Sequence, residues 1–455
     1  MNDATRKLLA DAARRGADYL DGVGRRPVYP HAADIERLRS ALAGGVPHDP
    51  LPDAEVLAFL DDLGAPATVA SAGGRYFGFV TGGALPAAVA AHVLATAWDQ
   101  NAFSFTSSPA AALFDETAIR WLREIFGVPV ESAGAFVVGA SAANLAGLAA
   151  ARHAVLARAG WDVEEQGLRD APPLTVLVGA EVHATINKLL PLLGIGRTQL
   201  VRVPVDGQGR MCADALPEIR GPAIVCIQAG NVNSGAFDPA PAIIAQARAA
   251  GAWVHVDGAF GLWAAASEER RHLAEGFAGA DSWATDAHKW LNVPYDCGVS
   301  FVRDEQALRA AMSISGDYLL LGRHRDAIDI TLDGSRRARG FEVWAALRSL
   351  GRQGLADMID RNCDQASWLA GRLAAAGVEV LNDVVLNQVV VAFGSDANTK
   401  RVIAALQEGR AIWAGGTRWH GRDALRISVS AWATTQDDMA LTLEAILAAA
   451  GARRS

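Results

Sequence analysis

The sequence predicts an α/β protein with a mostly parallel sheet covered by helices on both faces, an N-terminal helical segment and a smaller C-terminal α+β domain. Three observations lead to this prediction. From Gly134 onward, short apolar segments alternate with helical patterns, which is typical of parallel strands joined by helices. The 455 residues are 51% hydrophobic and 20% charged, which is enough for a large buried core. Beyond residue 335, a long helical pattern gives way to intermixed strands and helices.

These patterns divide the chain into three parts. Residues 1–75 carry interrupted helical patterns that cannot close a core alone, so we expect them to pack on a neighbour, in this chain or in a partner subunit. Residues 76–335 form the large domain, whose seven expected strands lie at 135–138, 174–178, 198–203, 223–228, 253–257, 282–285 and 298–302. Residues 336–455 form the small domain, with helices expected at 340–375, 397–408 and 434–449 and strands at 378–381, 388–393 and 425–430.

The charge balance points to a small-molecule ligand. The chain has 42 basic and 50 acidic residues and a net charge of −8, so we expect neither nucleic acid nor an anionic membrane as a partner. The four cysteines show no metal or disulfide spacing, and we predict no metal site. No apolar run reaches the roughly 18 residues of a membrane span, and the first residues lack a signal-peptide core, so a cytoplasmic location is expected. The cysteines are Cys212, Cys226, Cys297 and Cys363.

Open α/β sheets bind ligands at the carboxyl ends of their strands, so polar residues there are candidates for a site. The turn GASAAN at 139–144 joins a strand to a helix, and Ala140 and Ser141 are placed to hold a phosphate at the helix N-terminus. An ordinary serine N-cap gives the same pattern. A serine nucleophile elbow would require glycine at Ala143, and no dinucleotide or P-loop motif is present.

Two further candidates follow buried strands. Asp257 ends the apolar strand WVHVD, where a carboxylate needs a cationic or donating partner, although a turn or cap aspartate is an equal alternative. Lys289 is one of four lysines and follows a buried strand among tryptophans. Desolvation there would lower the pKa of Lys289 and make its amine nucleophilic. The alternative is a structural lysine whose stem packs on apolar side chains while its amine reaches solvent.

His183 follows another strand and opens a helix; by itself it is better explained as a partly buried structural histidine. Together, the four candidate groups match one ligand. An aldehyde suits the lysine, a basic ring nitrogen suits Asp257, a flat face suits His183, and a phosphate suits the turn at Ser141. Pyridoxal 5′-phosphate (PLP) has all four features.

The sequence resembles the group II PLP-dependent amino-acid decarboxylases, the family of aromatic-amino-acid and glutamate decarboxylases. The likeness runs through most of the chain. Its motifs are RYFGFVTGG at 75–83, GAFDP at 235–239, HVDGAFG, DAHKWL followed by YDCG, SRRARGFEVW at 335–344 and LRISVSAWATT at 425–435.

The resemblance implies the fold-type-I PLP-dependent transferase fold, an obligate homodimer with active sites at the subunit boundary, and N-terminal helices exchanged between subunits. It implies that Lys289 forms the Schiff base, Asp257 pairs with the pyridinium nitrogen, and Ala259 and His183 lie on opposite ring faces. His288 is implied beside the lysine as a further catalytic residue. The implied cofactor-binding residues are Ala140, Ser141, His183, Asn231, Asp257, Ala259, Asp286, His288 and Lys289, with Asn231 standing where relatives commonly have threonine.

The implied reaction is decarboxylation of an L-amino acid to an amine and CO2. Aromatic residues favour an aromatic or apolar substrate, although aromatics also fill dimer interfaces, and Arg75, Arg323 or Arg325 would suit an acidic one. The predicted substrate-pocket residues are Tyr76, Phe79, Phe103, Tyr318 and His324, with Phe103 reaching across the subunit boundary.

The sequence departs from the family at one sensitive place. Relatives carry a loop tyrosine that protonates the carbon left by decarboxylation, whereas residues 319–334 contain no tyrosine, so Tyr318 or His324 would have to replace it. Oxidative decarboxylation with deamination to an aldehyde, or another amino-acid lyase reaction, is therefore the alternative. A serine hydrolase based on Ser141 and an inert dimer that keeps the cofactor only for stability are the other hypotheses.

Overall fold

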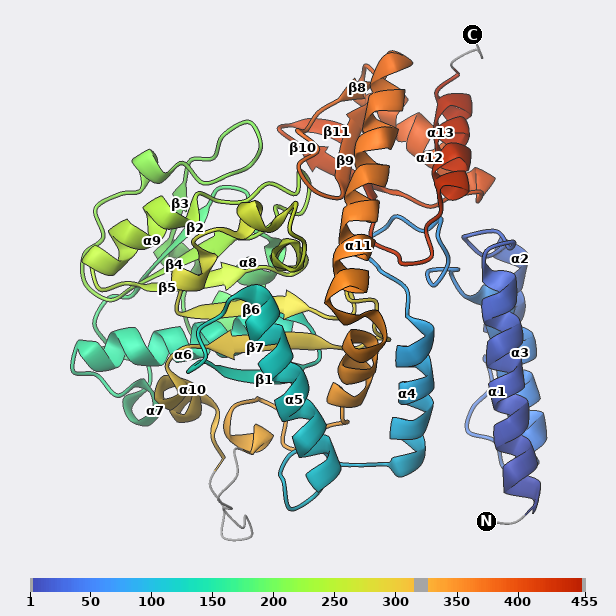
Figure 1. Cartoon of the computed structure of the whole chain (residues 1–455), viewed down its shortest axis with the longest axis horizontal. Helices are drawn as coiled ribbons and strands as arrows, with labels where there is room; N and C mark the ends of the chain where they lie inside the picture. Colours follow the sequence, from blue (N-terminus) through green and yellow to red (C-terminus); the bar gives the residue numbers. More distant parts are fainter. Residues whose placement is uncertain (1–2, 315–325, 452–455) are drawn as a thin grey trace.

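The computed structural model describes residues 3–314 and 326–451 and places a large seven-stranded sheet beside a smaller four-stranded one (Figure 1). The large sheet has the order β1-β7-β6-β5-β4-β2-β3. Strands β3, β2, β4, β5 and β6 run parallel, and β7 is antiparallel to both of its neighbours. Its strands are β1 (Ala133–Val137), β2 (Thr175–Gly179), β3 (Leu200–Val203), β4 (Ala223–Gln228), β5 (Trp253–Asp257), β6 (Ser282–Asp286) and β7 (Gly298–Val302).

Helices cover both faces of this sheet, as the alternating pattern predicted. The core on one face draws on α6 (Ala140–Arg158), α8 (Ala184–Leu192) and α10 (Glu305–Met312). The core on the other face draws on α5 (Pro109–Phe126), α9 (Ala240–Ala249) and α11 (Gly340–Ala375). The central strands β4, β5, β6 and β7 are buried along their whole length, which explains why their sequences are almost continuously apolar.

The small sheet has the order β10-β11-β9-β8, with all neighbours antiparallel. Its strands are β8 (Glu379–Val380), β9 (Gln388–Ala392), β10 (Gly415–Trp419) and β11 (Arg422–Ser428), and α12 (Asp396–Gly409) and α13 (Gln436–Ala450) pack with it in a separate core. Helix α11 runs from the large sheet to the small one and breaks at Gly351, which has φ 63° (Figure 1). The strand at 415–419 was not predicted.

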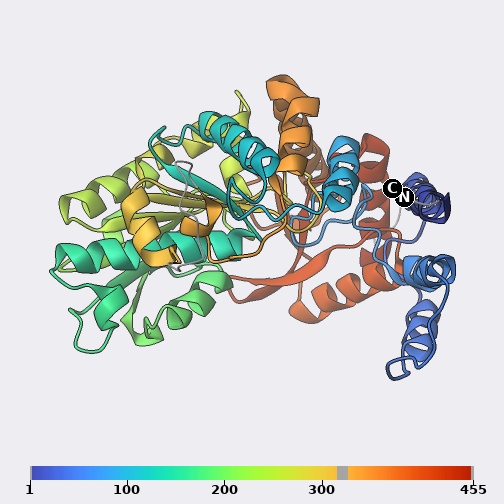
Figure 2. The same cartoon turned by 90° about the horizontal axis from the view of Figure 1, so that it is seen from below.

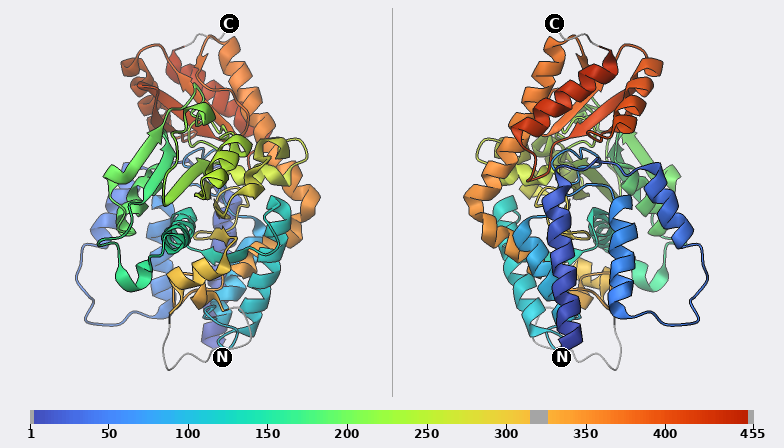
Figure 3. Two further views of the ribbon diagram at one scale, coloured as in Figure 1. Left: turned by 90° about the vertical axis from the view of Figure 1, so that its left-hand side faces the viewer. Right: turned by 90° about the vertical axis from the view of Figure 1, so that its right-hand side faces the viewer.

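The N-terminal segment lies at one side of the molecule. Helices α1 (Asp3–Val23), α2 (Ala32–Ala41) and α3 (Asp53–Ala67) contain no buried residue and project beyond α4 (Pro86–Trp98), as Figure 2 shows. The two termini lie at opposite ends of the molecule (Figure 3). The remaining helix, α7 (Val163–Gln166), is short. Among the described residues, none of the helices combines the length and apolarity that crossing a bilayer requires.

Candidate active site

A cavity of about 470 Å³ lies at the carboxyl ends of β4, β5 and β6, the edge at which open α/β sheets bind ligands. It brings together all four side-chain groups that the sequence singled out. Its lining consists of Phe79, Val80, Val138, Gly139, Ala140, Ser141, Asn144, His183, Thr185, Gln228, Gly230, Val232, Asp257, Ala259, Phe260, Asp286, His288, Lys289 and Arg426.

Lys289 lies just after β6, in a turn that is anchored by buried tryptophan and leucine side chains at 290 and 291. Its Nζ is 2.9 Å from Oδ2 of Asp286, the last residue of the strand. A Cβ at Gly82 would lie 1.9 Å from the carbonyl oxygen of Lys289, so only glycine permits the preceding loop to approach this turn. The lysine amine is therefore held at the cavity wall by a carboxylate.

Asp257 ends β5 and is 6% exposed. Its Oδ1 accepts a hydrogen bond from the backbone amide of Ala259 at 3.3 Å. His183 caps the N-terminus of α8, where its Nδ1 accepts from the amide of Thr185 at 3.3 Å, so a neutral ring carries its proton on Nε2. Burial lowers the pKa of His183 below its ordinary value, and the nearby Asp257 carboxylate opposes that shift. The cavity thus holds a carboxylate and an imidazole within electrostatic reach of each other.

The N-terminus of α6 faces the same cavity. The backbone amide of Ala140, in the first turn of this helix, donates to Oδ1 of Asp286, while Ser141 is exposed. A helix N-terminus attracts negative charge, and here a carboxylate oxygen already receives one of its amides. An anionic group such as phosphate fits the chemistry of this end of the cavity.

His288 lies between the lysine and a tyrosine that the sequence reasoning missed. Its Nδ1 accepts from the amide of Cys297 at 3.1 Å, and its Nε2 is 3.5 Å from Oδ1 of Asp286. Its ring stacks on Tyr295 with the ring centroids 4.3 Å apart. Burial lowers the pKa of His288, so its ring favours the neutral form. Tyr295 also shares a hydrogen bond of 3.2 Å with the hydroxyl of Thr81.

Asn231 is not brought to the cavity, although its neighbours Gly230 and Val232 line it. Its Oδ1 accepts from the amides of Asn233 and Ser234, at 2.8 and 3.3 Å, and so closes its own turn. Its Nδ2 lies beside Gly209, where a Cβ would meet it at 2.7 Å. The role implied for Asn231 near the cofactor ring therefore stays a prediction that this geometry does not support.

The predicted substrate-pocket residues are divided. Phe79 lines the cavity and is 63% exposed, whereas Tyr76 does not line it and stacks on Trp413 with the ring centroids 5.0 Å apart. Phe103 does not line the cavity of its own chain, and its carbonyl accepts from the amide of Ile328 at 3.0 Å. Tyr318 and His324 lie outside the described residues, as do Arg323 and Arg325.

Arg426 is a charged cavity residue that sequence reasoning overlooked. It belongs to β11 of the small sheet, and its Nη1 donates to the carbonyl of Val232 at 3.0 Å. Burial alone lowers the pKa of its guanidinium, because no carboxylate of the described chain is paired with it. The available signal was an arginine inside the apolar strand pattern LRIS, which is costly without a partner or a ligand.

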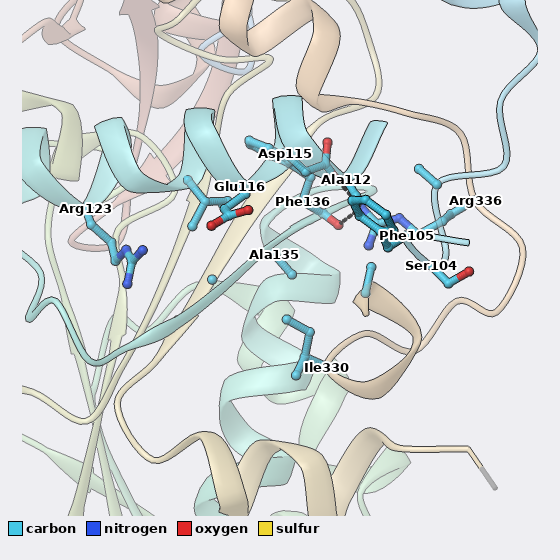
Figure 4. A pocket seen from close by; sticks show the side chains of 14 residues that line it. Ser104, Phe105, Ala112, Asp115, Glu116, Arg123, Ala135, Phe136, Ile330 and Arg336 are labelled. Atoms are coloured by element: carbon cyan, nitrogen blue, oxygen red, sulfur yellow. Dashed lines mark hydrogen bonds and ion pairs between the residues drawn. The ribbon is translucent and has the colours of Figure 1, made fainter. Parts of the chain in front are cut away.

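A second cavity of about 420 Å³ lies between α5 and the open edge of β1, as Figure 4 shows. There the guanidinium of Arg336 donates to the carbonyl of Phe136 and lies 3.9 Å from Asp115. Burial raises the pKa of Asp115 to about 6. The remaining Nε and Nη1 of Arg336 are sealed inside the protein, so this arginine caps the edge strand and offers little to a ligand.

Comparison with known proteins gives a consistent result. The family model described as the pyridoxal-dependent decarboxylase conserved domain matches residues 68–393. The chain is 30% identical over 301 residues to an acidic amino acid decarboxylase of Mus musculus, a match that covers 63% of this chain and 54% of that protein. It therefore aligns with about half the length of that relative.

A rice protein and a solved structure extend the comparison. Tryptophan decarboxylase 1 of Oryza sativa subsp. japonica is 28% identical over 376 residues, which cover 77% of this chain and 72% of the rice protein. The crystal structure of Oryza sativa TDC with PLP and tryptamine superposes with a TM-score of 0.91 at 24% identity and covers 99% of this chain and 98% of that one. That structural likeness supports the fold.

Proposed function

Because this chain belongs to the family of pyridoxal-dependent decarboxylases, we propose that it decarboxylates an L-amino acid with an aromatic or apolar side chain. The family, the fold class and the PLP cofactor predicted from the sequence are confirmed. One observation carries the proposal. Lys289, Asp257, His183 and the N-terminus of α6 converge on one cavity at the carboxyl edge of the sheet.

The groups lining the cavity fit PLP. The helix N-terminus, with Ser141 beside it, suits the phosphate, because it offers backbone N–H donors and a hydroxyl; the Ala140 amide, which now donates to Asp286, would have to be released by that carboxylate. The amine of Lys289 suits the aldehyde, and Asp257, at the end of a buried strand, suits the basic ring nitrogen. When bound, PLP joins the substrate amino group through its aldehyde carbon and draws electrons from a bond at Cα.

The protein side chains then bind, orient and move protons. The Asp257 carboxylate holds the proton on the ring nitrogen through a charge-assisted hydrogen bond of about 1.5–3 kcal/mol. His183, kept neutral by burial, offers a flat uncharged face. The amine of Lys289 is held 2.9 Å from Oδ2 of Asp286, so this carboxylate positions it at the cavity wall to move a proton. Arg426 is the cationic group available to orient the substrate carboxylate.

The side chains around the cavity favour an apolar substrate. Phe79, Val80, Val138, Val232 and Phe260 line it, and the first and third of these are exposed at its mouth. The relatives' printed names include both an acidic amino acid and tryptophan, so family membership leaves the substrate open.

An acidic substrate gains no support from Arg75. Its guanidinium donates to the carbonyls of Gly24, Arg26 and Ala411, so it ties the N-terminal segment to the small domain. It does not line the cavity.

We further propose a homodimer with shared active sites. The N-terminal segment exposes large apolar side chains: Val56 and Leu60 on α3, and Leu51 just before it. In addition, Phe103 does not line the cavity of its own chain. If Phe103 serves the partner's cavity, coexpressed Phe103→Ala and Lys289→Ala chains will regain activity that neither variant has alone. If the protein has twice the chain mass of 47.7 kDa but the coexpressed variants regain no activity, the subunits do not share active sites.

The reaction itself is tested by assaying the purified holoenzyme against the twenty L-amino acids and their common derivatives. We expect an amine and CO2 in equal amounts, with aromatic or apolar substrates turned over fastest. Lys289→Ala should abolish turnover and the borohydride-trapped adduct, while the exposed Lys188→Ala serves as the control. Aldehyde, ammonia and peroxide as products would establish the oxidative alternative instead. Hydrolase activity that survives Lys289→Ala would refute the proposal.

A further inference from the structure

Four polar side chains form a continuous row inside the apolar core, directly below the cavity. The indole Nε1 of Trp253 is 2.8 Å from Oγ of Ser282, which is 2.8 Å from Nδ1 of His255. The Nε2 of His255 is 2.7 Å from Oδ1 of Asn144. None of the four is more than 1% exposed. The row begins in β5, crosses to β6 and back, and ends on α6 at the cavity.

The row has one direction, because the amide oxygen of Asn144 can only accept and lies against Nε2 of His255. The Nδ1 of His255 then accepts from the Ser282 hydroxyl, and the Ser282 oxygen accepts from the Nε1–H of Trp253. The imidazole then carries its single proton on Nε2 and donates it to Oδ1 of Asn144. Burial lowers the pKa of His255 to about 3, so the ring is neutral and has this one donor.

The bond from His255 holds the amide of Asn144 in one orientation. With Oδ1 occupied by His255, the NH2 group is the end left for the cavity that Asn144 lines. No acceptor in the described part of the chain is bonded to that Nδ2. Asn144 lies one helical turn after Ala140, and helix side chains lean toward the N-terminus, so the amide faces the end of the cavity that suits the phosphate.

The packing around His255 shows how closely α6 is held to the row. A Cβ at Gly147 would lie 2.7 Å from both Cε1 and Nδ1 of His255 and 3.1 Å from Oγ of Ser282. Only glycine allows the helix to approach the imidazole this closely. The turn of α6 from Asn144 to Gly147 therefore packs against His255 and Ser282, the residues that set the orientation of Asn144.

We propose that His255 and Ser282 are positioning residues that hold the Asn144 amide with its NH2 group directed into the cavity, where it donates a hydrogen bond to the bound cofactor. The inference depends on PLP as the cofactor and is independent of the substrate. Without the row, the amide would be free to turn and present its oxygen, an acceptor, to an anionic ligand.

The test compares two variants of equal shape. Ser282→Thr keeps the hydroxyl and Ser282→Val removes it, so the added methyl group cancels between them. Cofactor-free protein is titrated with PLP, and the dissociation constant and the induced circular dichroism of the bound cofactor are measured. We expect Ser282→Val to bind PLP roughly two- to tenfold more weakly than Ser282→Thr, the effect of one hydrogen bond, with an altered dichroism band.

Two further variants separate positioning from stability. Trp253→Phe removes the donor at the far end and lowers the melting temperature, but it leaves the bonds from Ser282 to Asn144, so PLP affinity should stay at the wild-type value. Asn144→Asp keeps an acceptor for His255 and removes the NH2 donor, so it should weaken PLP binding even where Ser282→Val does not fold.

Equal PLP affinity in Ser282→Val and Ser282→Thr, or in Asn144→Asp and the wild type, would overturn the proposal. So would a loss of affinity in Trp253→Phe as large as in Ser282→Val, because the row would then act through stability alone. These readouts use PLP without substrate, so they remain decisive if the decarboxylation proposal fails.

Discussion

Arg426 offers a prediction in which stability and function move in different directions. Its guanidinium lines the cavity and has a single backbone acceptor, the carbonyl of Val232, with no carboxylate of the described chain to offset its charge. Arg426→Met keeps a long apolar stem of similar reach and removes the charge. We expect the substrate to lose its carboxylate partner while the protein loses a poorly compensated buried cation.

The two effects have different sizes. A charge-assisted hydrogen bond to the substrate carboxylate is worth about 1.5–3 kcal/mol, which converts to roughly a 10- to 100-fold lower kcat/KM. In the free protein, the lost bond to Val232 costs about 1 kcal/mol, whereas the substitution removes the desolvation penalty of a guanidinium whose charge no carboxylate of the described chain offsets. The melting temperature should therefore stay the same or rise.

Steady-state kinetics and thermal unfolding of the same preparations measure both effects. Arg422→Met is the matched control: it lies in the same strand, its Nη1 bonds an exposed glutamate at 2.8 Å, and it does not line the cavity. It should change neither quantity much, since surface ion pairs contribute little. A marked fall in the melting temperature of Arg426→Met with an unchanged kcat/KM would show that Arg426 is structural, and the reasoning would be refuted.

Three further predictions concern buried groups. Burial raises the pKa of Asp238 from 3.8 to about 6, so the folded state binds a proton more tightly than the unfolded state, and about 3 kcal/mol of stability present below pH 4 is lost as the pH rises through 6. Asp238→Asn should flatten this slope in melting temperatures between pH 4 and 7; an unchanged slope would exclude Asp238 as its source. Gly147→Ala should cost about 1–3 kcal/mol, seen as a lower melting temperature, because the new Cβ meets His255 at 2.7 Å; an unaltered melting temperature would mean that α6 shifts freely. Asp257→Asn should retain PLP, seen by absorbance, but lower kcat about 10- to 100-fold, and full turnover would disprove its role at the ring nitrogen.

Much of the large sheet could be predicted because its strands are buried on both faces and therefore appear in the sequence as apolar runs. The expected strand at 253–257 coincides with β5, and that at 298–302 coincides with β7. Strand order could not be predicted in this way. The insertion of β7 between β1 and β6, antiparallel to both, depends on long-range pairing that no local pattern encodes.

The missed strand β10 has a local explanation. Its sequence, GGTRW, begins with two glycines and carries an exposed arginine, so it resembles a turn. It becomes a strand because β11 pairs with it along its whole length. Pairing with a neighbour overrides a weak local preference.

Asn231 shows the corresponding limit at the site. Its position at a strand end was predictable, but the direction of its side chain was not, because the turn N-V-N-S gives the amide oxygen two local backbone donors. The turn therefore occupies the amide oxygen of Asn231, while its Nδ2 is buried without a hydrogen-bond partner among the described residues. Position at the edge of a sheet selects candidates, and hydrogen-bond competition decides which of them face the ligand.

In the strand WVHVD, His255 matters to the candidate site as well as the final residue, Asp257. Side chains alternate along a strand, so His255 and Asp257 share a face, and the aspartate that ends the strand at the cavity has an imidazole one step below it. A histidine inside an apolar strand is costly unless both of its nitrogens are paired. Its partners, Ser282 on the next strand and Asn144 on the covering helix, join the sheet to α6, whose N-terminus lies at the end of the cavity proposed for the phosphate. In this strand, the polar interruption one step before the carboxylate proposed to hold the ring nitrogen thus marks the residues that support the candidate site.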